Sequence, residues 1–154
     1  MTGGSGSASR GVGADSDGGL ARVEISRRCI EALNARRLDD YFAYLTRDFV
    51  LRTAPGTPGG RIEAGRAALE RFYSSFFAAW DDLRYEFIEG PMAVGERVLS
   101  KDRWTGRERG TGRERSIEFF SVASFRDTLA SSVDVFLDPE EAMEFARGGQ
   151  AEGE

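Results

Sequence analysis

The segment VLSKDRW, residues 98–104, carries an acidic side chain where a strand usually places an apolar one. Strand-like alternation puts Val98, Ser100, Asp102 and Trp104 on one face. A carboxyl group on an inward face loses its hydration, which raises its pKa toward the range useful for proton transfer. We therefore predict Asp102 as a catalytic residue, acting as a general base or polar anchor in a pocket.

A structural role for Asp102 is the competing interpretation. Acidic residues are rarely buried without a partner, and Arg28 or Arg52 could pair with this one in the core. Twist of the strand could also bring the carboxylate to solvent at the rim. The sequence leaves these alternatives open, because its pattern places no second acid or base beside Asp102.

The amino-acid composition excludes several kinds of catalytic and metal-binding site. The chain has no histidine and a single cysteine, Cys29, so histidine-dependent catalysis and His- or Cys-based metal sites are excluded. Any catalysis must use carboxylates, tyrosine, arginine, serine, threonine or the one lysine, Lys101. We expect no metal and no cofactor.

Aromatic residues are the candidates for the wall of a pocket around Asp102. Tyr41 and Tyr73 could donate hydrogen bonds to a ligand carbonyl, and Phe76, Trp104 and Phe120 could line the cavity. The spacing of the tyrosines is also that of ordinary core residues. The 11 Phe, 4 Tyr and 2 Trp could equally fill the interior of the domain.

The periodicity of apolar residues predicts the elements that position these side chains. Helical spacing predicts three helices, over residues 22–37, 37–45 and 65–80. Alternation predicts five strands, over 48–53, 83–89, 97–106, 116–125 and 131–137, with loops at 54–60 and 90–96. A final helix follows Asp138 and Pro139 and stops at Gly148. Helices first and an antiparallel meander afterwards predict an α+β fold.

The chain reads as one domain between two tails. Residues 1–19 are rich in Gly and Ser and poor in bulky apolar side chains, which predicts a disordered tail, and residues 149–154 look similar. The domain is then residues 20–148. Its 40% hydrophobic and 31% charged composition is typical of a soluble globular protein.

The charge balance limits the partners. A net charge of −5 and a pI of about 5.0 argue against nucleic acid and against an anionic membrane. With neither a membrane-spanning run nor a signal peptide in the sequence, we expect a cytoplasmic protein. The repeated TGRER unit at 105–115 could bind an anion through its arginines or could form a solvated hairpin tip.

Three longer segments resemble the SnoaL-like family of the nuclear-transport-factor-two-like superfamily. They are GRAALERFYSSFFAAWDDLRYEF, GERVLSKDRWTGRERGTG and VDVFLDPEEAMEFA, and the resemblance runs from about residue 22 to 147. It implies a cone-like α+β fold, in which a curved antiparallel sheet wraps around N-terminal helices and a short C-terminal helix follows. It also implies a deep apolar pocket for a small hydrophobic molecule, and a homodimer formed through the outer face of the sheet.

The known active sites of the superfamily do not carry over to this sequence. At the positions of the tyrosine and the base of ketosteroid isomerase stand Cys29 and Thr53. The Asp-Arg-Asp relay of limonene epoxide hydrolase falls on Asp102, Trp104 and a position near Val135. Two hypotheses follow. One is a cofactor-independent cyclase, hydratase, isomerase or hydrolase; the other is a non-catalytic binding or dimerisation module with a filled or vestigial pocket.

Overall fold

The computed structural model describes residues 17–54 and 62–148. Along the chain the elements are α1 (Asp17–Asn34), α2 (Leu38–Ala43), β2 (Leu45–Arg52), β3 (Ile62–Ala64), α3 (Arg66–Ala79), β4 (Trp80–Val94), β5 (Arg97–Glu108), β6 (Glu114–Arg126), β7 (Leu129–Phe136) and α4 (Pro139–Ala146). The predicted α+β class, with N-terminal helices, a curved sheet and a short C-terminal helix, is confirmed.

The six strands form one sheet in the order β3-β2-β7-β6-β5-β4. Neighbouring strands are antiparallel except β2 and β7, which run parallel. The sheet is therefore a meander, β4 to β7, extended at one edge by strands that precede it in sequence. The predicted sheet was antiparallel throughout, and the parallel pair arises because β2 returns to the sheet beside its last strand.

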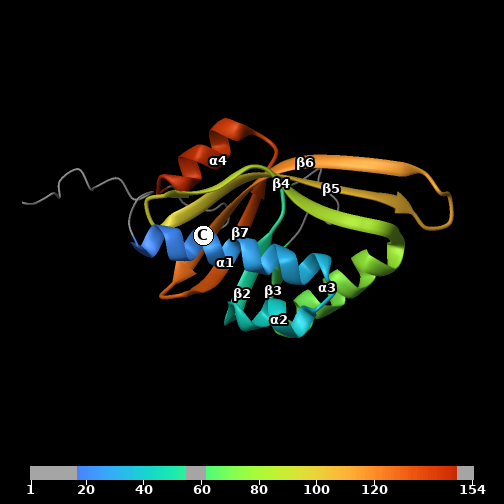
Figure 1. The fold of residues 1–154 in the computed structure, drawn as a ribbon, viewed down its shortest axis with the longest axis horizontal. Coiled ribbons are helices and arrows are strands. Elements are labelled where there is room, and N and C mark those ends of the chain that lie inside the picture. The colour runs from blue at the N-terminus through green and yellow to red at the C-terminus, as the bar shows by residue number, and fades with distance from the viewer. Residues whose placement is uncertain (1–16, 55–61, 149–154) are drawn as a thin grey trace, which may run out of the picture.

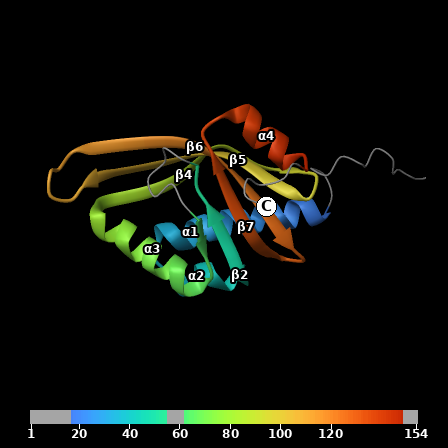
Figure 2. The same ribbon diagram turned by 180° about the vertical axis from the view of Figure 1, so that it is seen from behind.

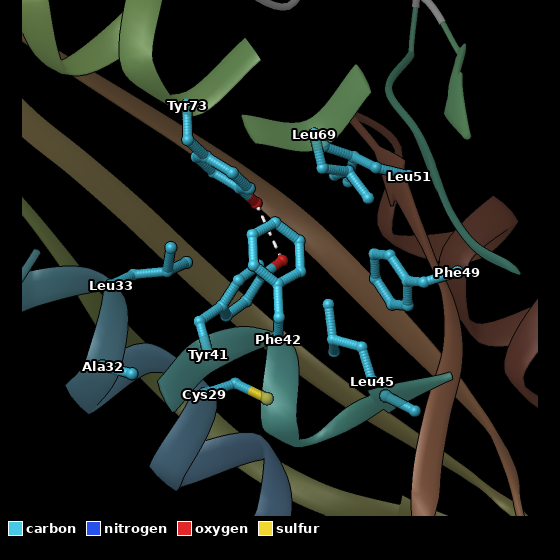
Figure 3. Packing of buried hydrophobic residues seen from close by; sticks show 11 residues of the cluster. Cys29, Ala32, Leu33, Tyr41, Phe42, Leu45, Phe49, Leu51, Leu69 and Tyr73 are labelled. Atoms are coloured by element: carbon cyan, nitrogen blue, oxygen red, sulfur yellow. Dashed lines mark hydrogen bonds between the residues drawn. The ribbon is translucent and has the colours of Figure 1, made fainter. Parts of the chain in front are cut away.

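Helices cover both faces of the sheet (Figures 1 and 2). The first three helices lie on one side, and α4 lies on the other. The larger core is formed between the sheet and the first three helices, and Figure 3 shows how its side chains meet. Its buried members are Cys29, Ala32, Leu33, Tyr41, Phe42, Leu45, Phe49, Leu51, Leu69, Tyr73 and Ala130.

A second core lies under α4. Leu99 and Val122 of the outer sheet face pack against Ala142 and Phe145 of the helix. The helix begins as the sequence predicts, since the Asp138 side chain accepts a hydrogen bond from the Glu140 N–H at 3.4 Å. The sheet therefore buries apolar side chains on both faces in this region.

Some predicted boundaries differ from the structure. Helix α1 begins at Asp17, three residues before the predicted domain boundary. Strand β4 runs through the predicted 90–96 connection to Val94, and only Gly95 and Glu96 form the turn. Irregular pairing between Phe87 and Met92 interrupts the alternation there, which hides the strand in the sequence. The remaining parts of both predicted tails, and residues 55–60 of the predicted loop, lie outside the described residues.

The outer face of the sheet is partly charged where α4 does not cover it. Arg103 contacts Glu86 at 2.6 Å and Glu118 at 3.4 Å, and Lys101 lies 3.8 Å from Glu118. The homodimer expected on this face stays a prediction, and α4 already occupies part of the surface it would use. None of the described helices is long and apolar enough to cross a membrane.

Leu69 offers a test of the larger core, because its side chain is 0% exposed in α3 and lies outside the cavity described below. We expect Leu69→Ala to lower the free energy of unfolding by about 2–5 kcal/mol, through lost burial and an unfilled space. Leu137→Ala, at a site 48% exposed, should change it by less than about 0.5 kcal/mol. Urea unfolding of the two variants measures both values, and equal losses would contradict the packing described.

Candidate functional site

A cavity separates the first three helices from the concave face of the sheet. Its main lobe has a volume of about 100 Å³, and a second lobe has about 60 Å³. The two lobes share lining residues, namely Ile30, Tyr41, Tyr85, Ser121 and Val133. The wall of the main lobe is mostly apolar, and its polar groups are a few hydroxyls. This combination is typical of small-molecule sites.

Asp102 lies inward, as strand alternation predicts, and its side chain is 0% exposed. One carboxylate oxygen, Oδ2, accepts hydrogen bonds from the Tyr85 hydroxyl and, at 2.7 Å, from the Ser121 hydroxyl. The other oxygen, Oδ1, is buried and accepts no bond of normal geometry within the described residues. Tyr85 and Ser121 both line the cavity, so Asp102 meets it through these two hydroxyls.

Burial raises the pKa of Asp102 above its ordinary value. Hydrogen bonds from Ser100, Tyr85 and Ser121 oppose this rise by stabilising the charged form, but desolvation is the larger effect. Desolvation is strong because Phe87 and Phe119 are the cross-strand neighbours of Asp102 on β4 and β6. The Asp102 carboxyl group therefore stays neutral up to a higher pH than a carboxyl group exposed to water.

The strand register explains why Tyr85 and Ser121 meet at Asp102. Tyr85 pairs with Trp104, and Ser121 pairs with Ser100, so each partner lies diagonally across from Asp102 on the same face. Helix α1 fixes Tyr85 further, because Asn34 hydrogen-bonds both the N–H and the C=O of Tyr85 at 2.8 Å. The ring of Tyr85 also packs edge-on against Trp104, with centroids 4.7 Å apart. The position of the Tyr85 side chain is thus fixed by contacts with both helix α1 and the neighbouring strand β5.

Tyr41 and Tyr73 form a second polar group in the cavity wall. Their hydroxyl oxygens lie 3.0 Å apart, with α2 and α3 bringing them together (Figure 3). Burial raises the pKa of Tyr73 to about 12, although its hydrogen bond with Tyr41 acts in the opposite direction. The pKa of Tyr41 is raised well above its usual value, again chiefly by burial. Both phenols therefore stay protonated and act as hydrogen-bonding groups.

Most of the predicted wall residues lie where the sequence placed them. Tyr41, Tyr73, Phe76 and Trp104 all line the main lobe. Their role in binding a ligand stays a prediction.

The prediction that Phe120 lines the cavity is wrong. Its side chain packs on the outer face with the second core, under Lys101. Phe119 lines the main lobe instead. Successive residues of a strand point to opposite faces, so Phe119 contributes its ring to the cavity wall and Phe120 contributes its ring to the second core.

The arginines proposed as partners of Asp102 lie elsewhere. Arg28 pairs with Glu24 on α1 at 2.9 Å. Arg52 forms a 3.0 Å ion pair with Asp134, which is itself buried on the face opposite the cavity. Asp102 thus has hydroxyl partners and is not in an ion pair among the described residues.

The positions that the sequence resemblance aligned with catalytic groups of other enzymes line the interior. Thr53 and Val135 line the main lobe, and Cys29 lines the second. Burial raises the pKa of Cys29 to about 12, so its thiol is a poor nucleophile. None of these three side chains is an acid or base of ordinary strength. Within the described residues, no cluster of three or more His, Cys, Asp or Glu side chains could hold a metal ion.

The TGRER repeat forms the tip of the β5–β6 hairpin, away from the cavity. Arg107 contacts Asp82 at 2.9 Å, Arg109 contacts Asp81 at 2.8 Å, and Arg115 contacts Glu108 at 3.0 Å. These ion pairs match the interpretation of a solvated tip with mixed charge.

Sequence reasoning missed Tyr85 and Ser121. Alternation along 83–89 and 116–125 could have placed both on an inward face, together with Phe87 and Phe119. It could not show that they meet Asp102, since that depends on the register between three strands.

The fold and the cavity together define a class: a cone-like α+β domain with an interior cavity between helices and a curved sheet. The family model described as SnoaL-like domain matches residues 26–133. The chain therefore belongs to the SnoaL-like domain family, as the sequence resemblance predicts. A comparison with curated proteins gives no match.

Solved structures share the fold at low sequence identity. A protein of Jannaschia sp. CCS1 assigned as a SnoaL-like polyketide cyclase has a TM-score of 0.68 at 16% identity, covering 88% of this chain and 97% of its own. A cystatin-fold protein from Novosphingobium aromaticivorans has a TM-score of 0.65 at 23% identity, covering 75% and 97%. TerC, crystallised with polyporic acid, has a TM-score of 0.62 at 18% identity, covering 80% and 98%.

The raised pKa of Asp102 predicts a pH dependence of stability. The unfolded group has a pKa of about 3.9, so above this pH the folded state binds more protons and stability falls as pH rises, until the folded group also ionises. Asp102→Asn removes this fall, and its amide oxygen can still accept from Tyr85 and Ser121. Urea unfolding from pH 4 to 8 measures the free energy of unfolding of wild type and of Asp102→Asn. As pH rises, the variant should become more stable relative to wild type.

Asp102→Leu is the matched control, because it leaves both hydroxyls without an acceptor. It should lose about 1–3 kcal/mol for each unsatisfied group. A pH-independent difference between wild type and Asp102→Asn would contradict the raised pKa.

Proposed function

We propose that this protein binds a small, mostly apolar molecule of about the size of one ring in the cavity between its helices and its sheet. The observation that carries this proposal is a mostly apolar interior whose wall includes the hydroxyl groups of Tyr41, Tyr73, Tyr85 and Ser121. Apolar walls supply the affinity, and a few polar groups orient the ligand.

The size of the ligand follows from the volume. An engineered apolar cavity of about 150 Å³ holds benzene, and the two lobes here, of about 100 and 60 Å³, are of that order. A larger ligand would require the wall to move. Two structural relatives support a small-molecule-binding function: one is assigned as a polyketide cyclase, and another was crystallised with polyporic acid.

A cofactor-independent proton transfer is the second candidate function, favoured by the contact between Tyr85 and Asp102. Asp102 contacts the cavity only through the hydroxyls of Tyr85 and Ser121, so it would not remove a proton from the ligand directly. Tyr85 could accept a proton from a ligand C–H beside a carbonyl while its own proton passes to ionised Asp102. The C–H electron pair then remains on the ligand as an enolate, and all protons are accounted for.

The binding proposal is tested with cyclohexanone, cyclohexanol and methylcyclohexane as probes. Trp104 lines the cavity, and Trp80→Phe leaves it as the only tryptophan of the chain. We expect saturable changes in its fluorescence with these probes. Val133→Phe, which fills the junction of the lobes, should weaken binding at least about tenfold, whereas Leu137→Phe on the surface should leave it unchanged. Absence of saturation with all three probes would reject the proposal.

The proton-transfer candidate is tested by exchange of the cyclohexanone α-hydrogens in D₂O, followed by NMR. We expect the protein to accelerate exchange, with a rate that rises as Asp102 ionises. Asp102→Asn and Tyr85→Phe should each reduce the rate to the level without protein. Tyr44→Phe, outside both lobes, is the control. An unchanged rate in Asp102→Asn would exclude the relay.

A further inference from the structure

Four of the hydroxyl groups that line the cavity form hydrogen bonds that show where their protons go. Tyr41 and Tyr73 contact each other at 3.0 Å. Tyr85 and Ser121 both contact Oδ2 of Asp102. All four side chains line the main lobe.

The first pair has one proton more than it uses. Two hydroxyl groups carry two protons, and a single contact between their oxygens holds only one. Within the described residues neither hydroxyl of the pair has another hydrogen bond. Whichever hydroxyl donates to the other, one O–H remains available. A buried donor without an acceptor costs free energy, so a ligand oxygen at this place is stabilised.

The second pair has no proton to spare. Tyr85 and Ser121 direct both protons to Asp102, because a carboxylate only accepts. Tyr85 and Ser121 still donate both protons when Asp102 is neutral with its proton on Oδ1, because both hydrogen bonds are accepted by Oδ2. What these hydroxyls present to the cavity is therefore their lone pairs.

We propose that this proton arrangement selects the ligand: a cyclic hydroxyketone or a molecule with the same pattern. Its carbonyl accepts from the Tyr41–Tyr73 pair, and its hydroxyl donates to the Tyr85–Ser121 pair. Asp102 acts as a positioning residue, which fixes the second pair as acceptors without touching the ligand. This inference rests on the proposed binding function and adds the chemical class and orientation of the ligand.

The test compares 4-hydroxycyclohexanone with cyclohexane-1,4-dione by isothermal titration calorimetry. The two probes share one ring and one carbonyl, and they differ in offering a donor or a second acceptor. We expect wild type to bind the hydroxyketone about tenfold more tightly, because the second carbonyl of the dione faces lone pairs.

Variants of Asp102 separate its role from simple packing. In Asp102→Leu the hydroxyls of Tyr85 and Ser121 lose their acceptor and become free to donate to a ligand. The preference for the hydroxyketone should then disappear or invert toward the dione. Asp102→Asn keeps an oxygen acceptor and should keep the preference. Tyr85→Phe, which removes one acceptor without altering Asp102, should reduce the preference even if Asp102→Leu does not fold.

Variants of the tyrosine pair test the donor end. Replacing both Tyr41 and Tyr73 with Phe removes both hydroxyls of the pair. The double variant has no donor there and should bind both probes about tenfold more weakly.

The outcomes distinguish the two proposals. Equal binding of the two probes by wild type, or a preference unchanged in Asp102→Leu and Tyr85→Phe, would overturn the polarity inference while leaving a binding cavity. Failure of these probes and of methylcyclohexane to bind at all would overturn the proposed function itself.

Discussion

A buried carboxyl group that is hydrogen-bonded by hydroxyls rather than paired with a cation is the constraint on which the interior depends. Asp102 is fully buried, and the partners of its Oδ2 come from β4 and β6 on either side. Tyr85 in turn is bound through its backbone by Asn34 of α1. One acid thus couples three strands and the longest helix, since a shift in any of them leaves a buried polar group unsatisfied.

The sequence could predict the fold and the direction of Asp102, because both rest on local periodicity. Its partners could not be predicted, because they depend on pairing between strands whose alternation is interrupted near Gly90 and Pro91. The prediction that Phe120 lines the cavity is wrong for a related reason. Adjacent phenylalanines at 119 and 120 look alike in sequence, and the choice of inward ring requires knowing that α4 forms a second core on the outer face.

The family relationship explains the fold better than the chemistry. The SnoaL-like match covers the elements that enclose the cavity, and the residues at 29, 53 and 135 still face inward. Their side chains are a thiol, a hydroxyl and an isopropyl group, none of which is an effective acid or base here. Shared architecture preserves where side chains point, whereas the reaction depends on which groups occupy those places.

The cavity and the buried acid are both unfavourable for stability, and they lie together. At about 24 cal/mol per Å³, a main lobe of about 100 Å³ corresponds to roughly 2 kcal/mol of lost packing. Burying a carboxyl group whose partners are hydroxyls rather than a cation adds a desolvation cost. The aromatic side chains could have filled the space, yet Phe72, Phe76 and Trp104 form its wall. The proposed ligand-binding function would account for both costs lying at one place.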